Sequence, residues 1–480
     1  MPCTRHLIAL AALMLAGCGA GDDGALDVAL IGNEDTVFTR GILLSDSAQT
    51  LRAATESGLL ELNAQGEVVP ALAETWLPTE DGLSYIFRLR DTTWPDGTPI
   101  SAQSARAALV AAMARLEGTS LGRDLAPVEE VRAMAGRVIE IRLSAPEPYF
   151  LQLLAQPELA LRYEDGGTGP MSFSRAEGYA AQLAFKPPEE RGLPASEDWR
   201  ERVRDIDLVV VDAQTAIELF DDGAVEVVLG GDLGTLPLVD VGPLSTGTLR
   251  VDATIGLFGL LPRRADGVLA DAVTREALAM AIDREALIGR FNIGGWPPAT
   301  RIVPALVPGV SASAPRWGDD IELRRAEARS RIGGSAPALS LALPEGTGWD
   351  MLLDELAQQW SSIGVTLRRA ESTAAADLVL VDRIARYPSR RWFLDQFNCE
   401  LRRGLCSGET DALIAQALGE SDPERRAALT AQAEAEFTER NIFIPIAAPL
   451  RWSLVRGSVT GFEPNPWAFH PLPPMAQIPR

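Results

Sequence analysis

The sequence predicts an α/β protein of two lobes, because it contains two separate β-α-β patterns. In the first, short β-branched runs at Ile206–Val211 and Val225–Leu229 flank a predicted helix. In the second, predicted strands at Leu339–Leu343 and Val365–Arg369 flank a helix from Trp349 to Ile363 whose apolar residues form one continuous face. Such units form parallel sheets. Two sheets in separate halves of a 480-residue chain suggest two lobes with a cleft between them.

Further strands are predicted before the first pattern. Leu26–Ile31 is a short apolar run bounded by glycine and asparagine, which indicates a strand, and residues 33–47 are expected to form a loop. Leu83–Leu89 and Val138–Leu143 alternate apolar and polar residues, as half-buried strands do. The N-terminal third of the chain is therefore expected to be rich in strands.

Three longer helices and one more strand complete the expected elements. Ser101 is a suitable N-cap for a helix that runs to about Leu116. The apolar spacing within Asp271–Phe291 predicts one helix, and Pro423–Phe437 predicts another, with Asp422 as its cap and a proline in its first turn. Asp377–Val381 predicts a further strand in the second sheet.

The charge of the chain excludes one class of partner. The formal net charge is −22, and the acidic residues are spread along the sequence rather than gathered in a tail. Phosphate backbones would be repelled, and no basic block relieves that repulsion. The sequence therefore predicts no nucleic-acid partner.

The N-terminus has the features of an export signal. An apolar run from Leu7 to Ala16 follows Arg5 and is too short to span a bilayer. It ends in Leu15-Ala16-Gly17-Cys18, which resembles the bacterial lipobox. We therefore expect a signal peptide at residues 1–17, a lipid on Cys18 and a tether at residues 18–25 that holds the protein at a membrane. The alternative is an ordinary signal whose cleavage site happens to hold a cysteine.

Two cysteines remain in the mature chain if Cys3 leaves with the signal and Cys18 carries the lipid. In an oxidising compartment Cys399 and Cys406 are expected to pair. A zinc site is the alternative, but no histidine or further cysteine lies nearby in the sequence to complete four ligands. The sequence predicts no metal site and no cofactor.

Several blocks of sequence resemble those of ABC transporter solute-binding protein family 5, the peptide, dipeptide and nickel-binding class. Each block is weak alone, but their order and spacing together are specific and extend almost from end to end. The blocks are Gly66–Trp76, Trp94–Pro99, Thr168–Pro170, Arg275–Leu287, and Ser453–Arg456 with Asn465-Pro466.

The resemblance implies a periplasmic-binding-protein fold of class II type, with an extra inserted subdomain and a ligand cleft between the lobes. It implies a monomer that encloses a peptide or peptide-like solute by hinge closure and delivers it to ABC permease subunits from the periplasm. The implied division is residues 26–45, 160–250 and 453–480 for lobe I, 46–159 for the subdomain, and 251–452 for lobe II.

The resemblance also indicates where the ligand would bind. In the family, a strand-end loop reading Ala-Asp-Tyr-Pro carries the acid that pairs with a peptide's amino group, and here Arg386 takes the place of that acid. A guanidinium would repel an ammonium and attract an anion. We therefore expect an anionic or N-blocked ligand, with Arg386 as its partner, Tyr387 and Trp392 as walls, and Asp382 and Arg383 nearby.

Two other residues are weaker candidates for ligand contacts. Phe258 belongs to a segment where the family often has Ala-Phe-Asn and this chain has Leu-Phe-Gly, so a polar group near the hinge is lost. Thr36 lies in the loop after the first strand, which could supply ligand contacts from the first lobe. The alternative is that this loop is a plain connector. For the arginine loop, the alternative is that Arg386, Arg390 and Arg391 form a solvated surface.

The sequence contains no recognisable arrangement of catalytic residues. The mature chain keeps a single histidine, His470, between Phe469 and Pro471, where a structural role is favoured over a general base. A secreted hydrolase would need a nucleophile with a base. We therefore expect a binding protein rather than an enzyme, and a non-transporting lipoprotein sensor or partner protein is the main alternative.

Overall fold

A computed structural model describes residues 24–163, 166–176, 179–239, 247–310, 316–318 and 320–478. The predicted signal peptide, residues 1–17, and the predicted lipid attachment site, Cys18, lie outside the described residues. Within the described part of the chain, no helix is long and apolar enough to cross a membrane.

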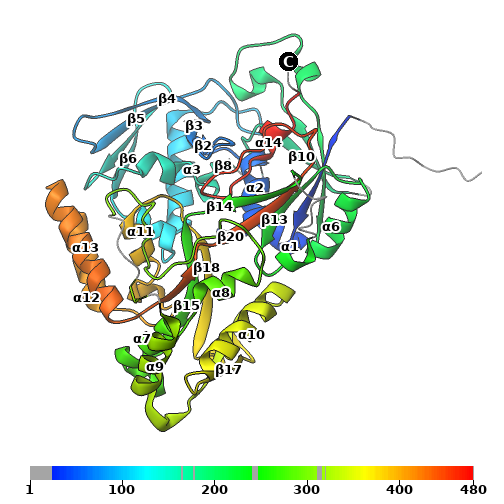
Figure 1. Ribbon diagram of the computed structural model, residues 1–480. Helices are drawn as coiled ribbons and strands as arrows, with labels where there is room; N and C mark the ends of the chain where they lie inside the picture. Colours follow the sequence, from blue (N-terminus) through cyan, green and yellow to red (C-terminus); the bar gives the residue numbers. More distant parts are fainter. Residues whose placement is uncertain are drawn as a thin grey trace, which may run out of the picture.

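The first sheet has seven strands and contains the chain's N-terminal strand (Figure 1). Its three central strands are parallel, because β1 pairs with β12 on one side and with β13 on the other. Helix α6 (Ala213–Asp221) connects β12 to β13, as the first β-α-β pattern predicts. The strands, in sheet order, are β10 (Met171–Ala176), β11 (Tyr179–Phe185), β12 (Ile206–Val211), β1 (Leu26–Ile31), β13 (Val227–Asp232), β20 (Leu450–Val455) and β14 (Leu249–Ala253).

The second sheet has five strands and contains the second predicted β-α-β pattern. Helix α10 (Thr347–Ser361) buries Trp349, Leu352, Leu356 and Trp360 against it, which is the apolar face expected from the sequence. The strands, in sheet order, are β17 (Thr366–Arg369), β16 (Ala338–Ala342), β18 (Leu378–Ile384), β15 (Gly256–Pro262) and β19 (Ile444–Ala447).

An antiparallel sheet of four strands forms the core of the early insertion, with helix α3 (Ala102–Arg115) packed on it. Ser101 caps α3 and forms a capping box with Ser104. The strands, in sheet order, are β4 (Ala73–Pro78), β5 (Ser84–Leu89), β7 (Val138–Leu143) and β6 (Val128–Ala133). Two small hairpins accompany it, β2–β3 (Leu60–Leu62, Val68–Pro70) and β8–β9 (Arg162–Tyr163, Gly166–Gly167).

Two chain crossings join the seven-stranded and five-stranded sheets. One runs from the end of β14 at Ala253 to the start of β15 at Gly256, and the other from Ala447 of β19 to Leu450 of β20. The Thr254 hydroxyl donates a hydrogen bond to the Pro449 carbonyl, so the two crossings are tied to each other. Two sheets joined by two short crossings form a two-lobed fold, as predicted.

Two expectations about helices are wrong. The predicted helix over Asp271–Phe291 is two helices, α7 (Ala272–Met280) and α8 (Arg284–Gly289), because the Asp283 side chain accepts a hydrogen bond from the Ala286 amide and starts a new helix. The predicted loop over residues 33–47 contains α1 (Glu34–Val37), capped by Asn33, and the start of α2 (Asp46–Thr55).

The remaining helices lie mostly in the C-terminal half. Asp422 caps the predicted C-terminal helix, which extends two residues beyond the expected end. The helices are α4 (Ser120–Asp124), α5 (Phe150–Leu154), α9 (Ile321–Ile332), α11 (Arg390–Asp395), α12 (Gly408–Gly419), α13 (Pro423–Glu439) and α14 (Leu472–Met475).

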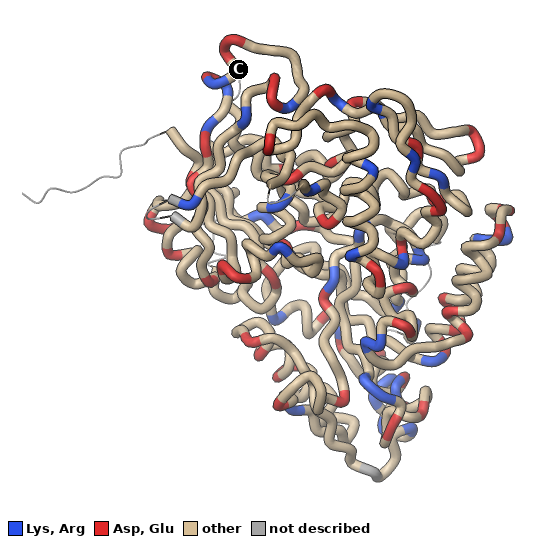
Figure 2. Tube along the Cα trace, turned by 180° about the vertical axis from the view of Figure 1, so that it is seen from behind, with Lys and Arg blue, Asp and Glu red and all other residues tan. Residues whose placement is uncertain are grey.

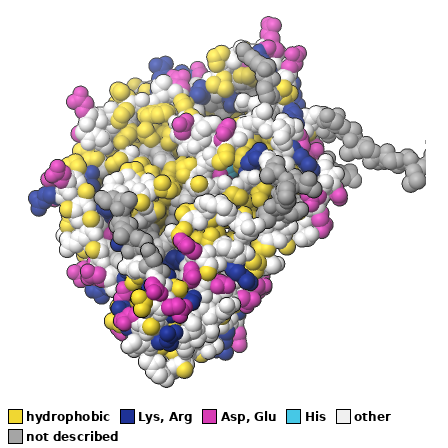
Figure 3. Space-filling model, viewed as in Figure 1, with side chains coloured by type: hydrophobic (Ala, Val, Ile, Leu, Met, Phe, Trp, Pro, Cys, Tyr) yellow, Lys and Arg dark blue, Asp and Glu magenta, His cyan; other side chains and the backbone are white. Residues whose placement is uncertain are grey.

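Acidic residues are distributed over all parts of the molecule (Figure 2). On the face shown in Figure 3, charged side chains surround the lower end, near α7 and α9, and hydrophobic side chains gather in the upper half. Exposed apolar side chains in the four-stranded insertion include Leu77, Ile86, Val110 and Met134. The negative charge of the chain is therefore not concentrated in one patch.

Candidate functional site

A cavity of about 220 Å³ lies where the lobes and the insertion meet. Every part of the fold contributes to its lining. The insertion and α2 supply Asp46, Gln49, Ser120, Gln156 and Pro157, the five-stranded lobe supplies residues 382–386 with Trp392 and Gln396, β20 supplies Arg451, and the C-terminal tail supplies Trp467, Ala468 and Phe469. A movement of one lobe relative to the other would therefore change the shape of this cavity.

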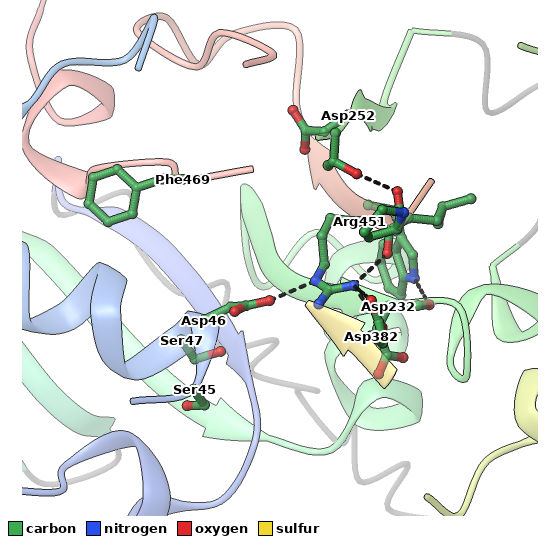
Figure 4. A network of polar contacts seen from close by, with 12 residues as sticks. Ser45, Asp46, Ser47, Asp232, Asp252, Asp382, Arg451 and Phe469 are labelled. Atoms are coloured by element: carbon green, nitrogen blue, oxygen red, sulfur yellow. Dashed lines mark hydrogen bonds and ion pairs between the residues drawn. The ribbon is translucent and has the colours of Figure 1, made fainter. Parts of the chain in front are cut away.

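An arginine on β20 joins two carboxylates at the cavity (Figure 4). Arg451 Nη1 donates to Asp382 Oδ1 at 3.0 Å and Oδ2 at 2.9 Å, and its Nε donates to Asp46 Oδ2 at 2.7 Å. Burial raises the pKa of Asp382 to about 6, against the opposing effect of the Arg451 charge, so the carboxylate is ionised at neutral pH. The Asp46 side chain is 45% exposed, and its Oδ1 accepts no hydrogen bond from a described residue.

A second cation of the cavity has no partner within the described structure. The backbone of Arg383 pairs with Leu257 in the sheet, and its side chain is exposed toward the cavity. No hydrogen bond or ion pair joins its guanidinium to a described residue. Burial and the neighbouring Arg386 charge lower the pKa of Arg383, but a guanidinium stays protonated at neutral pH. The cavity thus contains one positive charge that no described residue neutralises.

Arg386, the arginine expected to bind the ligand, is bound to the protein instead. Its Nη1 donates to Gln156 Oε1 at 2.6 Å and to Glu158 Oε2 at 3.0 Å, and its Nη2 donates to Glu158 Oε1 at 2.5 Å. The Glu158 side chain is only 2% exposed. The two residues therefore form a buried bidentate ion pair between the loop after β18 and the insertion. Arg386 lines the cavity, but its charge is compensated.

The alternative view of the arginine loop as a solvated surface is also wrong. Arg390 forms an ion pair with Glu434 at 2.6 Å, and Arg391 forms one with Glu147 at 2.5 Å. All three arginines of the loop therefore hold buried or half-buried carboxylates from other segments of the chain.

Tyr387 is not a wall of the cavity. Its side chain is fully buried, its hydroxyl donates to Asp124 Oδ1 at 2.9 Å, and it accepts from Arg391 Nη2 at 3.0 Å. Burial raises the pKa of Asp124 to about 7, against the lowering effect of Arg391, and Asp124 Oδ2 has no hydrogen-bond partner in the described structure. Tyr387, which was expected to contact the ligand, therefore joins the insertion to the five-stranded lobe.

The other predicted residues divide between the cavity and the rest of the molecule. Asp382, Arg383 and Trp392 line the cavity. Phe258 is 1% exposed and packs against Trp296 and Trp349 in the core of the five-stranded lobe, at centroid distances of 5.9 and 6.3 Å. Thr36 lies in α1, where its amide is bound by the Asn33 cap, and it does not line the cavity.

The sequence interpretation missed the C-terminal tail as a lining segment. Asn465 accepts hydrogen bonds from the amides of Trp467 and Phe469 and donates to the carbonyls of Ala64 and Phe469. This turn holds Ala468 at a φ of +46°, a left-handed conformation that alanine rarely adopts and that recurs at functional sites. The Asn465-Pro466 pair is the feature of the sequence that could have indicated this turn.

Other predicted contacts have a structural role. Cys399 and Cys406 form a disulfide with their Cα atoms 5.3 Å apart, as predicted. His470 Nε2 lies 3.0 Å from Asp252 Oδ2, and its ring stacks on Phe462, so the histidine fastens the tail to β14. No group of three or more His, Cys, Asp or Glu side chains could hold a metal ion among the described residues.

Comparisons with known proteins agree with this fold. The model of the bacterial extracellular solute-binding proteins, family 5 Middle, matches residues 67–398. The oligopeptide-binding protein OppA of Bacillus subtilis is 22% identical over 82% of each chain. The murein tripeptide-binding protein MppA of Escherichia coli has a TM-score of 0.78 at 19% identity, over 95% of this chain and 99% of that one. AgaA from A. tumefaciens R10, solved with agropinic acid, has a TM-score of 0.75 at 18% identity, over 95% and 99% of the two chains.

Proposed function

The chain belongs to the bacterial extracellular solute-binding proteins of family 5, and on this basis we propose that it delivers a small peptide-like solute to an ABC importer. The relatives that carry the proposal are named as oligopeptide-binding and di/tripeptide-binding proteins. The observation that supports it in this chain is a cavity lined by both lobes and the insertion, which contains an arginine that has no partner in the part of the chain that the structure describes. The solute is enclosed when the lobes close, and the closed form meets the permease.

The proposed ligand carries a carboxylate that binds Arg383. An unpaired guanidinium in a cleft favours an anion, and carboxylates suit its planar set of donors. The half-exposed Asp46 carboxylate is available to an ammonium group, because Arg451 occupies only one of its oxygens. A zwitterionic ligand with one charge of each sign therefore complements the cavity.

The size of the cavity favours a ligand with about the volume of a dipeptide. Its volume of about 220 Å³ is below the roughly 300–1,000 Å³ typical of pockets for drug-sized ligands. Trp392, Trp467 and Phe469 supply the apolar surface on which such a ligand would pack.

The cation proposed to bind an anionic ligand is Arg383 and not Arg386. The expectation of an N-blocked ligand depends on the Arg386 charge, and Glu158 compensates that charge, so repulsion of an ammonium no longer follows. The carboxylate end is now assigned to Arg383. AgaA is described in complex with an acid, which supports an organic acid as a ligand for this fold.

We propose that the protein is extracytoplasmic and is held to a membrane by a lipid on Cys18. We also propose that it acts as a monomer and catalyses no reaction. We assign lobe I to residues 26–45, about 160–253 and 450–480, the insertion to 46–159, and lobe II to 254–449. These limits place β14 and β20 whole in lobe I, whereas the sequence-based limits at 250 and 453 divide both strands.

Thermal unfolding of the chain from residue 19, with a panel of dipeptides, tests the proposal. Each dipeptide is supplied free, N-acetylated and C-amidated. A ligand at a hundred times its dissociation constant should stabilise the fold by ~2.7 kcal/mol. The proposal predicts that amidation abolishes most of the stabilisation and that the recovered ligand is chemically unchanged. Stabilisation by the amidated forms alone, cleavage of the ligand, or no stabilisation by any form would contradict it.

A further inference from the structure

A second cavity, of about 470 Å³, lies on the opposite side of α2 from the interlobe cavity. Asp46 and Gln49 of α2 line the interlobe cavity, whereas Leu51, Arg52 and Thr55 of the same helix line the second one. The rest of its lining comes from α1 and the loop after it, the β8–β9 hairpin, Pro95, Lys186 and β10, which lies beside α2 (Figure 1). The two cavities are therefore separated by one helix.

The charge of this second cavity is opposite to that of the molecule. Its described lining contains five cationic side chains and one carboxylate, Glu56, although the chain as a whole has 44 basic and 66 acidic residues. The cations are Arg40, Arg52, Arg162, Arg175 and Lys186, and Lys186 is the only lysine in the sequence.

Glu56 is shared by two of the guanidiniums. Its carboxylate lies 3.8 Å from Arg52 Nε and 3.3 Å from Arg162 Nε, and the buried Arg162 Nε makes no hydrogen bond of good geometry to a described residue. One carboxylate therefore faces two positive charges, while Arg52 Nη2 donates to the carbonyls of Thr39 and Gly41 at 2.8 and 2.9 Å. A buried donor without a partner is costly unless a ligand or water meets it.

Lys186 and Arg175 lie on the other side of the cavity. Among the described residues the Lys186 ammonium makes one hydrogen bond, to the Gly167 carbonyl at 3.3 Å, and burial lowers its pKa. Arg175 pairs with Glu34 at 2.9 Å and lies 4.0 Å over the ring of Phe38, which contacts Phe173 at a centroid distance of 5.6 Å. Even with Glu34 counted, cations outnumber carboxylates among the described residues around this space.

We propose that this second cavity binds a compact multivalent oxyanion, of the phosphate or pyrophosphate class. Such an anion would accept hydrogen bonds from Lys186 and Arg162 and compensate the excess positive charge of the cavity. The same chemistry could come from a free anion or from the headgroup of an anionic lipid. The site is distinct from the interlobe cavity, so it does not depend on which solute the protein delivers.

The single lysine provides a direct assay. The mature chain is acetylated with an amine-specific reagent, and the rate of modification of Lys186 is followed by mass spectrometry with and without pyrophosphate. Affinity is measured in parallel by calorimetry. The proposal predicts protection of Lys186 that is half-maximal at the calorimetric dissociation constant. Unchanged modification of Lys186 at saturating pyrophosphate would overturn it.

Variants distinguish a built site from general charge attraction. Arg175→Gln should weaken pyrophosphate binding about tenfold, because one of the positive charges that attract the anion is lost, and Lys186→Arg should retain binding. Arg200→Gln is the matched control: Arg200 is 52% exposed where Arg175 is 55%, pairs with a carboxylate, Asp205, and lies over an aromatic ring, Trp199. Equal weakening by Arg175→Gln and Arg200→Gln would overturn the proposal.

The two sources of the anion are separated with vesicles. The chain without its lipid is sedimented with phosphatidylglycerol vesicles and with neutral vesicles. Co-sedimentation with the anionic vesicles that Arg175→Gln abolishes would identify a lipid headgroup as the ligand. Protection by pyrophosphate without co-sedimentation would identify a free anion, and the absence of both effects would overturn the site.

Discussion

Arg451 and Asp382 form an ion pair that crosses between the two lobes. Arg451 belongs to the seven-stranded sheet and Asp382 to the five-stranded sheet, and one guanidinium nitrogen lies 2.9 and 3.0 Å from the two carboxylate oxygens. Both side chains are mostly buried, at 12% and 14% exposed. Buried ion pairs of this kind contribute little net stability but fix one geometry. The pair therefore holds the lobes in register beside the ligand cavity.

Arg451→Met should destabilise the protein by about 3 kcal/mol at neutral pH, because it leaves the Asp382 carboxylate buried without a partner. In the variant the pKa of Asp382 rises above the value of about 6 that it has beside Arg451. A group with a raised folded-state pKa loses stability as pH increases, so the loss should be larger at pH 8 than at pH 5. Urea unfolding at both values measures it. Arg368→Gln, at an exposed arginine of β17, is the control, and an equal loss at both pH values would contradict the account.

Asp124→Asn should flatten part of the pH dependence of stability. The folded-state pKa of Asp124 is about 7, well above that of an unfolded aspartate, so the protonated form is favoured by folding. Stability from this group is present at low pH and is lost as pH rises from about 4 to 7. Relative to the variant, the wild type should lose roughly 3 kcal/mol over this range. Parallel stability curves for the two proteins would show that Tyr387 and Arg391 keep Asp124 ionised, against the opposing charge of Asp395.

Removing the disulfide should lower stability without changing ligand selectivity. Cys399 and Cys406 are seven positions apart, and closing so short a loop stabilises a fold by about 2.5 kcal/mol in the chain-entropy account. The double variant Cys399→Ser, Cys406→Ser should unfold at a correspondingly lower urea concentration. Wild-type protein in a reducing agent provides the control, and it should match the variant. A loss below 0.5 kcal/mol, on the order of experimental error, would indicate that the loop is ordered by other contacts.

The local elements could be predicted where one face of a segment meets a large core. The strand Leu26–Ile31 and the helix capped by Ser101 are where the sequence places them, because their apolar period matches the core that they bury. The break in the predicted helix over Asp271–Phe291 was harder to predict. Asp283 reads as one polar residue on an exposed face, and only the structure shows that its side chain caps a new helix.

The candidate site was predictable in position but not in charge. The segment around Arg386 does line the interlobe cavity, as the family resemblance implies. Its partner Glu158 lies 228 positions earlier in the chain, and the Asp124 partner of Tyr387 lies 263 positions earlier. Neither pairing leaves a local pattern in the sequence. Arg383 keeps an unpaired charge because the nearby carboxylates are bound by other arginines through such distant contacts. The sequence alone therefore does not show which arginine stays unpaired.

The central claim is tested most directly by measuring how Arg383→Gln changes the preference for a free ligand carboxylate. Dissociation constants of one dipeptide and its C-amide are measured for the wild type, Arg383→Gln and the control Arg368→Gln. The account predicts a preference of about tenfold or more for the free carboxylate in the wild type and the control, and none in Arg383→Gln. An undiminished preference in Arg383→Gln would contradict it, because the carboxylate would then be bound by another group of the cavity.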